Sequence, residues 1–551
     1  MNWTEAQLQT IETRNKNILV SAAAGSGKTA VLIERIKQLM IKDKVDVDRF
    51  LITTFTNAAA AEMRERLEKA LNMEMEKEDA DKAFLRKQLM LMPSANISTF
   101  HTFALEVMRK FFYLTDLEPG FRIGDDTEVN IMKRESVEEL FDKRFEEDYD
   151  DLTAFLEKYS SERSERRLME NIVSLYDQMR SIPDYFRWAD ERTELLASES
   201  PSEALGLRAF VEKKCIKAAA QSARCFSKAA ELLYEAGLEK LYRKAQQDAD
   251  MVKSVADAAA RGGLQAFCEL YGSIGYNQMR ASKDEKEDYE VIKANVSSLR
   301  KKGKKLLDDV IGRYLGRSFD EYDEELRACH DDTVYMTGLM KELEVVFKEK
   351  KREKNIVDFD DVMHYAADIL RDEMAAGEYR NKFRYIFIDE FQDSNMLQEI
   401  IAGRIAGEDN LFMVGDVKQS IYKFRLAEPE IFKAKYALYS RNEDDKSIKI
   451  DLSSNFRSKK SVTELVNSVF GLIMEGYDEN SELKCTFSDE YPGLSPQLHI
   501  ISKESGDSGF MGSSFAEAQQ VVRLVEDSIG TEIFDAKMGV YRPAGYRDIA
   551  V

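Results

Sequence analysis

A short segment near the start of the chain has the residue types that hold the phosphates of a nucleoside triphosphate. It follows an apolar run, Ile18–Val20, that predicts a buried strand. Small residues then let backbone N–H groups turn toward phosphate oxygens at the positive end of the next helix. Lys28 supplies a cation for the β- and γ-phosphates, and the Thr29 hydroxyl is a ligand for Mg²⁺. The expected phosphate loop consists of Ala22, Ala23, Ala24, Gly25, Ser26, Gly27, Lys28 and Thr29.

Two carboxylates far downstream supply the complementary chemistry. Asp389 and Glu390 directly follow Tyr385–Ile388, a β-branched and aromatic run that predicts a second buried strand. Open α/β sheets bind ligands at the carboxyl ends of their parallel strands. At that edge Asp389 would hold Mg²⁺ through water, and Glu390 would orient and deprotonate an attacking water. The expected cofactors are therefore ATP and Mg²⁺.

Each motif also has a simpler explanation. The first could be a chance glycine-rich turn, and the second could be an exposed acidic turn. The order of strand, loop and helix around Lys28 argues against chance, although Ala22 stands where glycine usually opens the loop. An apolar strand directly before Asp389 argues against a simple acidic turn. Together the two motifs predict a P-loop NTPase of α/β class with a parallel sheet.

The rest of the chain predicts two α/β portions and one helical portion. Residues 1–115 and 356–445 show strand and helix patterns, and we expect them to share one sheet in a single ATP-binding domain. Residues 116–355 have mixed-charge helical patterns and predict a helical insertion domain. Residues 446–551 predict an incomplete second α/β domain. The other expected strands are Phe50–Thr54, Ile97–Thr99, Leu411–Val414, Ile448–Leu452 and Leu498–Ile501.

Two local patterns complete this organisation. Asp358–Met363 predicts a capped helix start. Tyr546–Val551 predicts the beginning of a further strand at which the sequence stops. We therefore expect the sequence to be part of a longer protein.

Composition limits the class of protein. The chain has 551 residues, too many for one hydrophobic core, so several domains are expected. The formal net charge of −21 argues mildly against nucleic acid as a partner, but a basic groove can coexist with acidic outer faces. The start of the chain lacks the pattern of a signal peptide, and no apolar stretch predicts a membrane span. The five cysteines have no metal-type spacing, which fits a cytoplasmic protein.

Six further motifs, in sequence order, give the chain a specific resemblance. It resembles the superfamily 1A DNA helicases of the UvrD/RecB type, and most closely the AddA group of ATP-dependent helicase–nuclease subunits. The resemblance implies two RecA-like domains, with motifs V and VI and a nuclease domain beyond residue 551. The matching segments are Trp3–Gln7 (Q motif), Thr54–Met63 (motif Ia), Ser98–Phe103 (motif Ib), Asp389–Asp393 (motif II), Val414–Arg425 (motif III) and Ser454–Ser458 (motif IV).

The resemblance also implies roles at the nucleotide. Gln7 would read the adenine edge, and Phe456 would stack on the base. Arg457 would act as an arginine finger on the transition-state charge, although a surface salt bridge is the alternative. Gln419 lies three residues before Tyr422, so one short segment could contact both the γ-phosphate and a DNA base.

A motor that moves along single strands needs aromatic faces on which bases of any sequence stack. The candidates are Phe55, Phe100, Tyr422 and Phe424, each of which could instead be a core aromatic. We favour Phe55 and Tyr422 as residues that face DNA. Many relatives have tryptophan where Phe424 stands, so this stacking face is smaller. The remaining expected DNA contacts are Thr56, Asn57, His101 and Arg425, with His101 expected at a strand end as a backbone contact rather than a catalytic base.

These observations favour an ATP-dependent DNA helicase or translocase. From the resemblance, it would move 3′→5′ on single-stranded or duplex-end DNA during double-strand-break repair and recombination, with no membrane and with a partner that is an AddB-like nuclease subunit. The alternative is an ATP- and DNA-binding fragment without a complete motor cycle. An SMC- or ABC-type ATPase is disfavoured because no Ser-Gly-Gly signature precedes the acidic strand.

Overall fold

The computed structural model describes residues 3–159, 165–283, 285–423, 427–442, 444–474, 477–478, 481–486, 496–501, 513–535 and 538–551. The chain divides into two compact units. The first comprises Met1–Ser21 with Thr29–Ile450, and the second comprises Ala22–Lys28 with Asp451–Val551. The phosphate loop therefore groups with the C-terminal unit.

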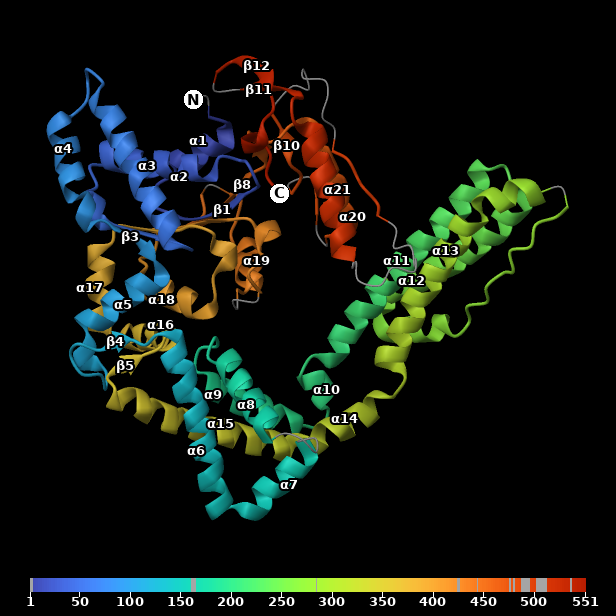
Figure 1. The fold of residues 1–551 in the computed structure, drawn as a ribbon, viewed down its shortest axis with the longest axis horizontal. Helices are drawn as coiled ribbons and strands as arrows, with labels where there is room; N and C mark the ends of the chain where they lie inside the picture. The colour runs from blue at the N-terminus through green and yellow to red at the C-terminus, as the bar shows by residue number, and fades with distance from the viewer. Residues whose placement is uncertain are drawn as a thin grey trace. The chain divides into compact units, whose positions relative to one another are not determined.

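A six-stranded parallel sheet is the centre of the first unit (Figure 1). Its strand order is β3-β2-β6-β7-β1-β8. The strands expected around both chemical motifs are thus in one sheet, which confirms the predicted α/β fold class. The strands are β1 (Asn17–Ala22), β2 (Phe50–Thr54), β3 (Asn96–Thr99), β6 (Tyr385–Ile388), β7 (Leu411–Gly415) and β8 (Ser447–Leu452).

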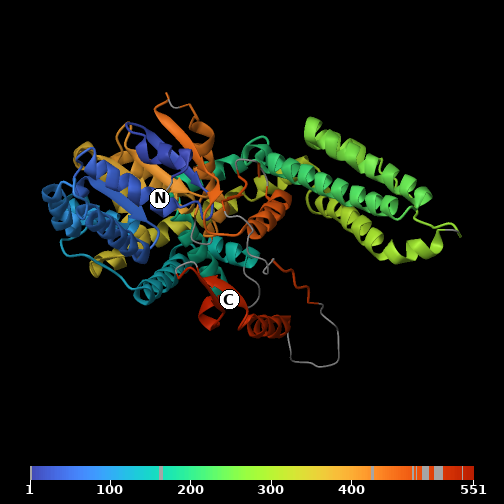
Figure 2. The same ribbon diagram turned by 90° about the horizontal axis from the view of Figure 1, so that it is seen from above.

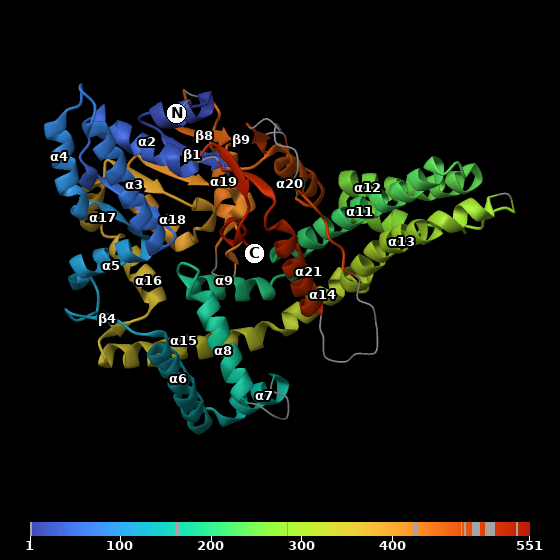
Figure 3. The same cartoon turned by 45° about the horizontal axis from the view of Figure 1, so that its top comes forward.

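The central strands are apolar on both faces because helices cover both faces. All four residues of β6 and all five residues of β2 and of β7 are buried. In Figures 1 and 3, α2 and α3 lie on one side of the sheet, and α16 and α18 lie on the other. The helices of this α/β portion are α1 (Glu5–Glu12), α2 (Lys28–Ile41), α3 (Asn57–Met75), α4 (Lys82–Leu91), α5 (Phe100–Lys110), α16 (Phe359–Ile369), α17 (Glu373–Lys382), α18 (Met396–Ile405) and α19 (Pro429–Leu438).

The segment between β4 (Arg122–Ile123) and β5 (Ile356–Val357) is helical, as its charge pattern predicted. Within it, α11, α12 and α13 lie side by side around their own apolar core (Figure 2). A second core joins α6, α7, α8 and α15. The helices are α6 (Asp126–Glu147), α7 (Tyr149–Tyr159), α8 (Glu165–Met179), α9 (Tyr185–Leu196), α10 (Pro201–Ala204), α11 (Leu207–Glu235), α12 (Glu239–Tyr271), α13 (Lys286–Val310), α14 (Phe319–Ala328) and α15 (His330–Glu353).

The second unit contains short elements. Its two small sheets pair β9 with β10 in parallel and β11 with β12 in antiparallel fashion. Its elements are β9 (Ser454–Asn455), α20 (Lys460–Ile473), β10 (Lys484–Cys485), α21 (Ser513–Ser528), β11 (Glu532–Asp535) and β12 (Val540–Pro543). Within the described parts of the chain, none of the helices combines the length and apolar character needed to cross a membrane.

Three expectations from the sequence are wrong. Ile448–Leu452 does not open a new sheet, since β8 forms the edge of the main one. Leu498–Ile501 is not a strand, and Leu498 and Ile500 are 86% and 85% exposed, so they lack the burial that a strand of this composition needs. At the C-terminal end, Tyr546–Asp548 is a 3₁₀ turn in which the Asp548 carboxylate accepts a hydrogen bond from the Gly545 N–H.

Candidate functional site

The phosphate loop has a backbone that requires glycine. It joins β1 to α2, and Gly25 and Gly27 have φ values of 72° and 80°. L-residues with a Cβ rarely adopt this left-handed region, whereas glycine does so at little cost. The two glycines therefore allow the tight turn before the N-terminus of α2, which begins at Lys28. This is the geometry in which a helix N-terminus offers N–H groups to an anion.

Residues of motif IV hold the phosphate loop within the second unit. The Asn455 side-chain amide donates to the Ala24 carbonyl oxygen at 2.7 Å, and the Phe456 N–H donates to the Gly25 carbonyl oxygen at 2.8 Å. A Cβ added at Gly25 would lie 2.9 Å from Cβ of Arg457. Arg457 therefore leaves the backbone directly beside the phosphate loop, and Phe456 is 38% exposed.

The carboxylates at the end of β6 lie in an unusual backbone. Glu390 has φ 52° and ψ 43°, a left-handed conformation that costs a residue other than glycine about 1–3 kcal/mol. Its N–H donates to the Asp389 carboxylate at 3.0 Å, and the Asp389 N–H donates to the Thr53 carbonyl oxygen at 3.0 Å. Neighbouring strands therefore fix the turn that positions both carboxylates.

Gln392 joins these carboxylates to motif III. Its side chain is only 2% exposed, and its amide nitrogen donates to Glu390 Oε2 at 2.9 Å and to Asp393 Oδ2 at 3.0 Å. Its Oε1 accepts from the Asp416 N–H at 2.9 Å. Asp416 Oδ2 in turn accepts from the Gln419 amide at 2.9 Å. We call Glu390, Gln392, Asp416 and Gln419 the carboxylate relay.

Gly415 makes the relay possible. It is the last residue of β7, and a Cβ there would lie 2.3 Å from Gln392 Oε1 and 3.0 Å from the Gln392 backbone nitrogen. A side chain at position 415 would therefore displace Gln392. Sequence reasoning missed the roles of Gln392, Asp416 and Gly415, although all three lie inside the quoted motifs.

Two of the proposed stacking residues are together at the end of the relay. The rings of Phe55 and Tyr422 have centroids 4.7 Å apart with an interplanar angle of 33°, and both residues are partly exposed. Thr56 caps α3 by accepting a hydrogen bond from the Ala59 N–H at 3.1 Å, and Asn57 is the first residue of that helix. Phe424 and Arg425 lie outside the described residues.

The structure corrects two expectations for motif Ib. Phe100 is 6% exposed in the apolar core under the sheet, so it has no free face for stacking. His101 is not at a strand end, because α5 begins one residue before it. Burial lowers the pKa of His101, which favours a neutral imidazole at pH 7. Its ring lies 5.9 Å from the ring of Phe359, which is 52% exposed and which sequence reasoning also missed.

Gln7 has a structural role in addition to any contact with a base. It is buried, accepts a hydrogen bond from the Thr4 N–H at 3.0 Å and closes a capping box at the start of α1. At the other end of α1, buried Arg35 of α2 donates to the carbonyl oxygens of Thr10 and Thr13, each at 2.7 Å. Burial lowers the pKa of Arg35 to about 9. Arg35 thereby fixes the helix of the Q motif to the helix after the phosphate loop.

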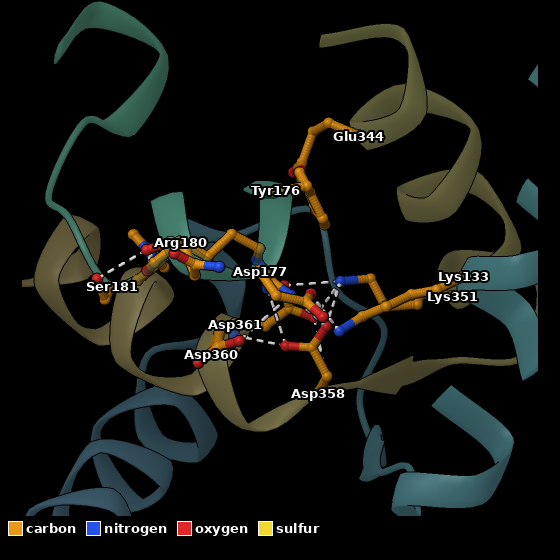
Figure 4. Close-up of polar contacts among 12 residues, drawn as sticks. Lys133, Tyr176, Asp177, Arg180, Ser181, Glu344, Lys351, Asp358, Asp360 and Asp361 are labelled. Atoms are coloured by element: carbon orange, nitrogen blue, oxygen red, sulfur yellow. Dashed lines mark hydrogen bonds and ion pairs between the residues drawn. The ribbon is translucent and has the colours of Figure 1, made fainter. Parts of the chain in front are cut away.

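A buried group of charges connects the helical segment to α16, the helix that carries Phe359 (Figure 4). We call Arg180, Lys351, Asp358 and Asp361 the junction cluster. Arg180 donates to both Asp358 oxygens at 2.7 and 2.8 Å and to Asp361 at 2.6 Å. Lys351 donates to Asp358 at 3.0 Å and to Asp361 at 2.6 Å.

The junction cluster also contains the predicted helix cap. Asp358 and Asp361 accept each other's backbone N–H groups, which is the capping box expected at this position. Burial would raise the pKa of Asp358, but the charges of Arg180 and Lys351 outweigh burial and keep that pKa well below its ordinary value. The carboxylate is therefore ionised, and its partners are fixed around it.

The sheet, the phosphate loop and the paired carboxylates define a P-loop NTPase with a RecA-like fold. Over residues 3–440 the chain matches the UvrD/REP helicase N-terminal domain. The chain therefore belongs to the UvrD/REP helicase family.

Similar proteins are named as ATP-dependent helicase/nuclease subunits of the A type. The one from Alkaliphilus oremlandii is 37% identical over 572 residues, which cover 100% of this chain and 47% of that protein. The one from Syntrophomonas wolfei is 39% identical over 521 residues, covering 92% of this chain and 41% of that protein. The one from Geobacillus kaustophilus is 34% identical over 593 residues, covering 100% and 47%. This chain spans about half the length of the curated relatives it matches.

Proposed function

We propose that the chain is the ATP-driven motor part of a DNA helicase that translocates on single-stranded DNA. The observation that carries this proposal is the continuity of one short segment. Residues 415–422 connect the carboxylate relay, which ends on Glu390, to the Phe55–Tyr422 ring pair. A change at the γ-phosphate can therefore reach a DNA base through Gln419 and three residues of backbone.

The residues present suit a nucleotide with a divalent cation. The left-handed glycines shape a loop for phosphate oxygens, and the oxygen donors of Thr29 and Asp389 are the ligand type that Mg²⁺ prefers. When bound, Mg²⁺ neutralises charge on the phosphates. In our proposal Lys28 binds the β- and γ-phosphates, and Glu390 takes the proton of the attacking water.

Three further residues complete the proposed nucleotide site. Arg457 stabilises the charge of the transition state, and its position beside Gly25 supports that role. Phe456 stacks on the adenine, and Gln7 contacts the adenine edge. The proposed domains are residues 1–115 with 356–445 and a helical insertion of 116–355, with the second RecA-like domain beginning after β8.

The proposed DNA contacts are aromatic. Phe55 and Tyr422 stack on bases, with Thr56, Asn57 and His101 at the backbone, and exposed Phe359 beside His101 is an added stacking residue. The 3′→5′ direction and a role in double-strand-break repair rest on the resemblance. The word "subunit" in the relatives' name supports a partner of the AddB type. The five cysteines are free thiols, which suits a cytoplasmic site of action.

The test is the isosteric substitution Glu390→Gln. We expect ATP affinity within about threefold of wild type, because Lys28 and the loop are intact. We expect kcat for ATP hydrolysis to fall by about 10²–10⁴-fold, the usual contribution of a general base. Lys28→Ala is the matched control, which should weaken ATP binding as well. Normal turnover by a folded Glu390→Gln protein would overturn the assignment.

A second candidate function is an ATP- and DNA-binding module without a complete motor cycle. The small sheets and exposed helix faces of the second unit, such as Leu465 and Leu472 of α20, favour it. Strand-separation assays distinguish the two: the motor unwinds duplex DNA with ATP, whereas the module binds single strands and ATP without unwinding.

A further inference from the structure

We propose that Trp188 forms an additional stacking position for a DNA base, next to the Phe55–Tyr422 pair. This inference rests on the proposed function and names a contact that none of the helicase motifs contains. Trp188 lies in the first turn of α9, in the helical segment, and is 37% exposed. Large aromatic residues are mostly buried, so an exposed tryptophan in a cavity is a candidate binding residue.

The cavity beside Trp188 has a volume of about 450 Å³, within the usual range of ligand pockets. Its walls come from three distant parts of the chain: the segment before and within α9, the start of α18, and the residues around motif III. They include Pro183, Trp188, Met396, Lys423, Ala427 and Glu428. The lining is mainly apolar, with a lysine at the rim, which suits a base with its phosphate.

The cavity is continuous with the proposed DNA track. Lys423 follows Tyr422 directly, and the Ala427 N–H donates to the Tyr422 carbonyl oxygen at 3.4 Å. One wall of the cavity is therefore attached to the residue whose ring pairs with Phe55. A strand whose base stacks at Tyr422 would place its neighbouring nucleotides at this wall.

The opposite wall is fixed before any ligand binds. Arg180, in the junction cluster, immediately precedes the Ser181–Pro183 wall. Asp184 has a left-handed φ of 48°, and its carboxylate accepts from Arg371 at 2.8 and 2.9 Å. The backbone N–H of Trp188 donates to the Asp184 carbonyl oxygen at 3.0 Å. This preorganisation limits the entropy lost when a base binds against the indole.

The charges around the cavity favour a nucleic-acid strand over an apolar protein segment. The Arg192 guanidinium lies over the Trp188 ring, 5.9 Å from its centroid, and Lys423 is exposed. Both cations can approach phosphates. The acidic Glu428 is already engaged, because its carboxylate accepts from the Met396 N–H at 3.3 Å at the start of α18.

Tryptophan fluorescence tests the proposal directly, because the chain has two tryptophans, Trp3 and Trp188. In a Trp3→Phe protein, Trp188 is the sole indole emitter. We expect oligothymidylate of about 16 nucleotides, a length within known single-strand site sizes, to quench this emission saturably. An unchanged emission at saturating oligonucleotide, with binding verified by anisotropy of a labelled strand, would overturn the proposal.

Affinity provides the second measurement. Trp188→Ala should weaken binding of the labelled oligothymidylate by about fivefold or more, the loss of one base–aromatic stack. Trp188→Phe should recover most of the affinity. Tyr234→Ala, at a tyrosine that is 65% exposed on α11, is the matched control and should bind as wild type does.

The outcomes separate the two proposals. If Tyr422→Ala weakens binding whereas Trp188→Ala does not, the Trp188 contact is wrong and the motor proposal stands. If wild-type protein fails to bind single strands at low salt, the proposed function itself fails. If Trp188→Ala abolishes capture of a partner protein but leaves oligothymidylate affinity and quenching unchanged, the cavity is a protein-docking site and our proposal is refuted.

Discussion

Gly415→Ala is the smallest substitution expected to uncouple ATP hydrolysis from ATP binding. The added Cβ would lie 2.3 Å from Gln392 Oε1, well inside the 3.0 Å below which real Cβ contacts essentially never fall. The nearest backbone atoms are the nitrogens of Gln392 and Phe391, at 3.0 and 3.2 Å. The Gln392 side chain must therefore move out of the carboxylate relay.

The magnitude follows from the hydrogen bonds that this movement breaks. Gln392 holds the Asp416 N–H at 2.9 Å, Glu390 at 2.9 Å and Asp393 at 3.0 Å. A buried polar group left without a partner costs about 1–3 kcal/mol, so we expect the variant to lose a few kcal/mol of unfolding free energy. Misplacement of a catalytic group by about 1 Å costs about 10²-fold in rate, and we expect that loss in kcat.

The assay measures two quantities side by side. ATP hydrolysis at saturating single-stranded DNA gives kcat, and titration with a fluorescent ATP analogue gives the nucleotide Kd, which should stay within about threefold of wild type. Gly403→Ala is the control, because Gly403 lies inside α18 with no atom within 4 Å of the added Cβ. If Gly415→Ala and Gly403→Ala hydrolyse ATP at the same rate, the relay does not position Glu390.

Two further predictions concern the junction cluster. Lys351→Met should reduce the free energy of unfolding by about 3–5 kcal/mol, because it leaves the carboxylates of Asp358 and Asp361 buried with one cation fewer, whereas Lys350→Met, which removes a partly exposed pair with Glu139, should cost less than about 1 kcal/mol; equal losses in denaturant titrations would contradict this. Because the folded-state pKa of Asp358 is lowered, its contribution should be fully present above its unfolded pKa of about 4 and should decline as pH falls further toward the folded value; a stability difference between wild type and Asp358→Asn that changes between pH 5 and 8 would refute this assignment.

The sequence predicted the elements whose signals are local. The apolar runs before Lys28 and Asp389, and the capping pattern at Asp358, each depend on neighbouring residues, and the structure confirms all three elements. Long-range packing decided the errors. Nothing in the residues around Phe100 distinguishes an exposed aromatic from one that packs under the sheet, and Ile448–Leu452 could pair with either domain.

The candidate site shows the same limit. Motif spacing located Gln419 and Tyr422, but Gln392 became visible only through the close approach that Gly415 allows. Trp188 is more than two hundred positions from motif III, so no periodicity or spacing could have placed it beside Lys423. Contacts of this kind depend on the tertiary fold and not on local preference.

Arg35 has a mechanical consequence for how the protein can move. A single buried guanidinium clamps the last carbonyl groups of α1 onto the middle of α2, so neither helix can rotate or slide without breaking charge-assisted hydrogen bonds in a dry environment. The span from the glutamine at the start of α1 to the first turn of α2 is therefore a stiff ruler. Any motion that accompanies ATP turnover must bend the chain at other joints, and leave the length of this ruler constant.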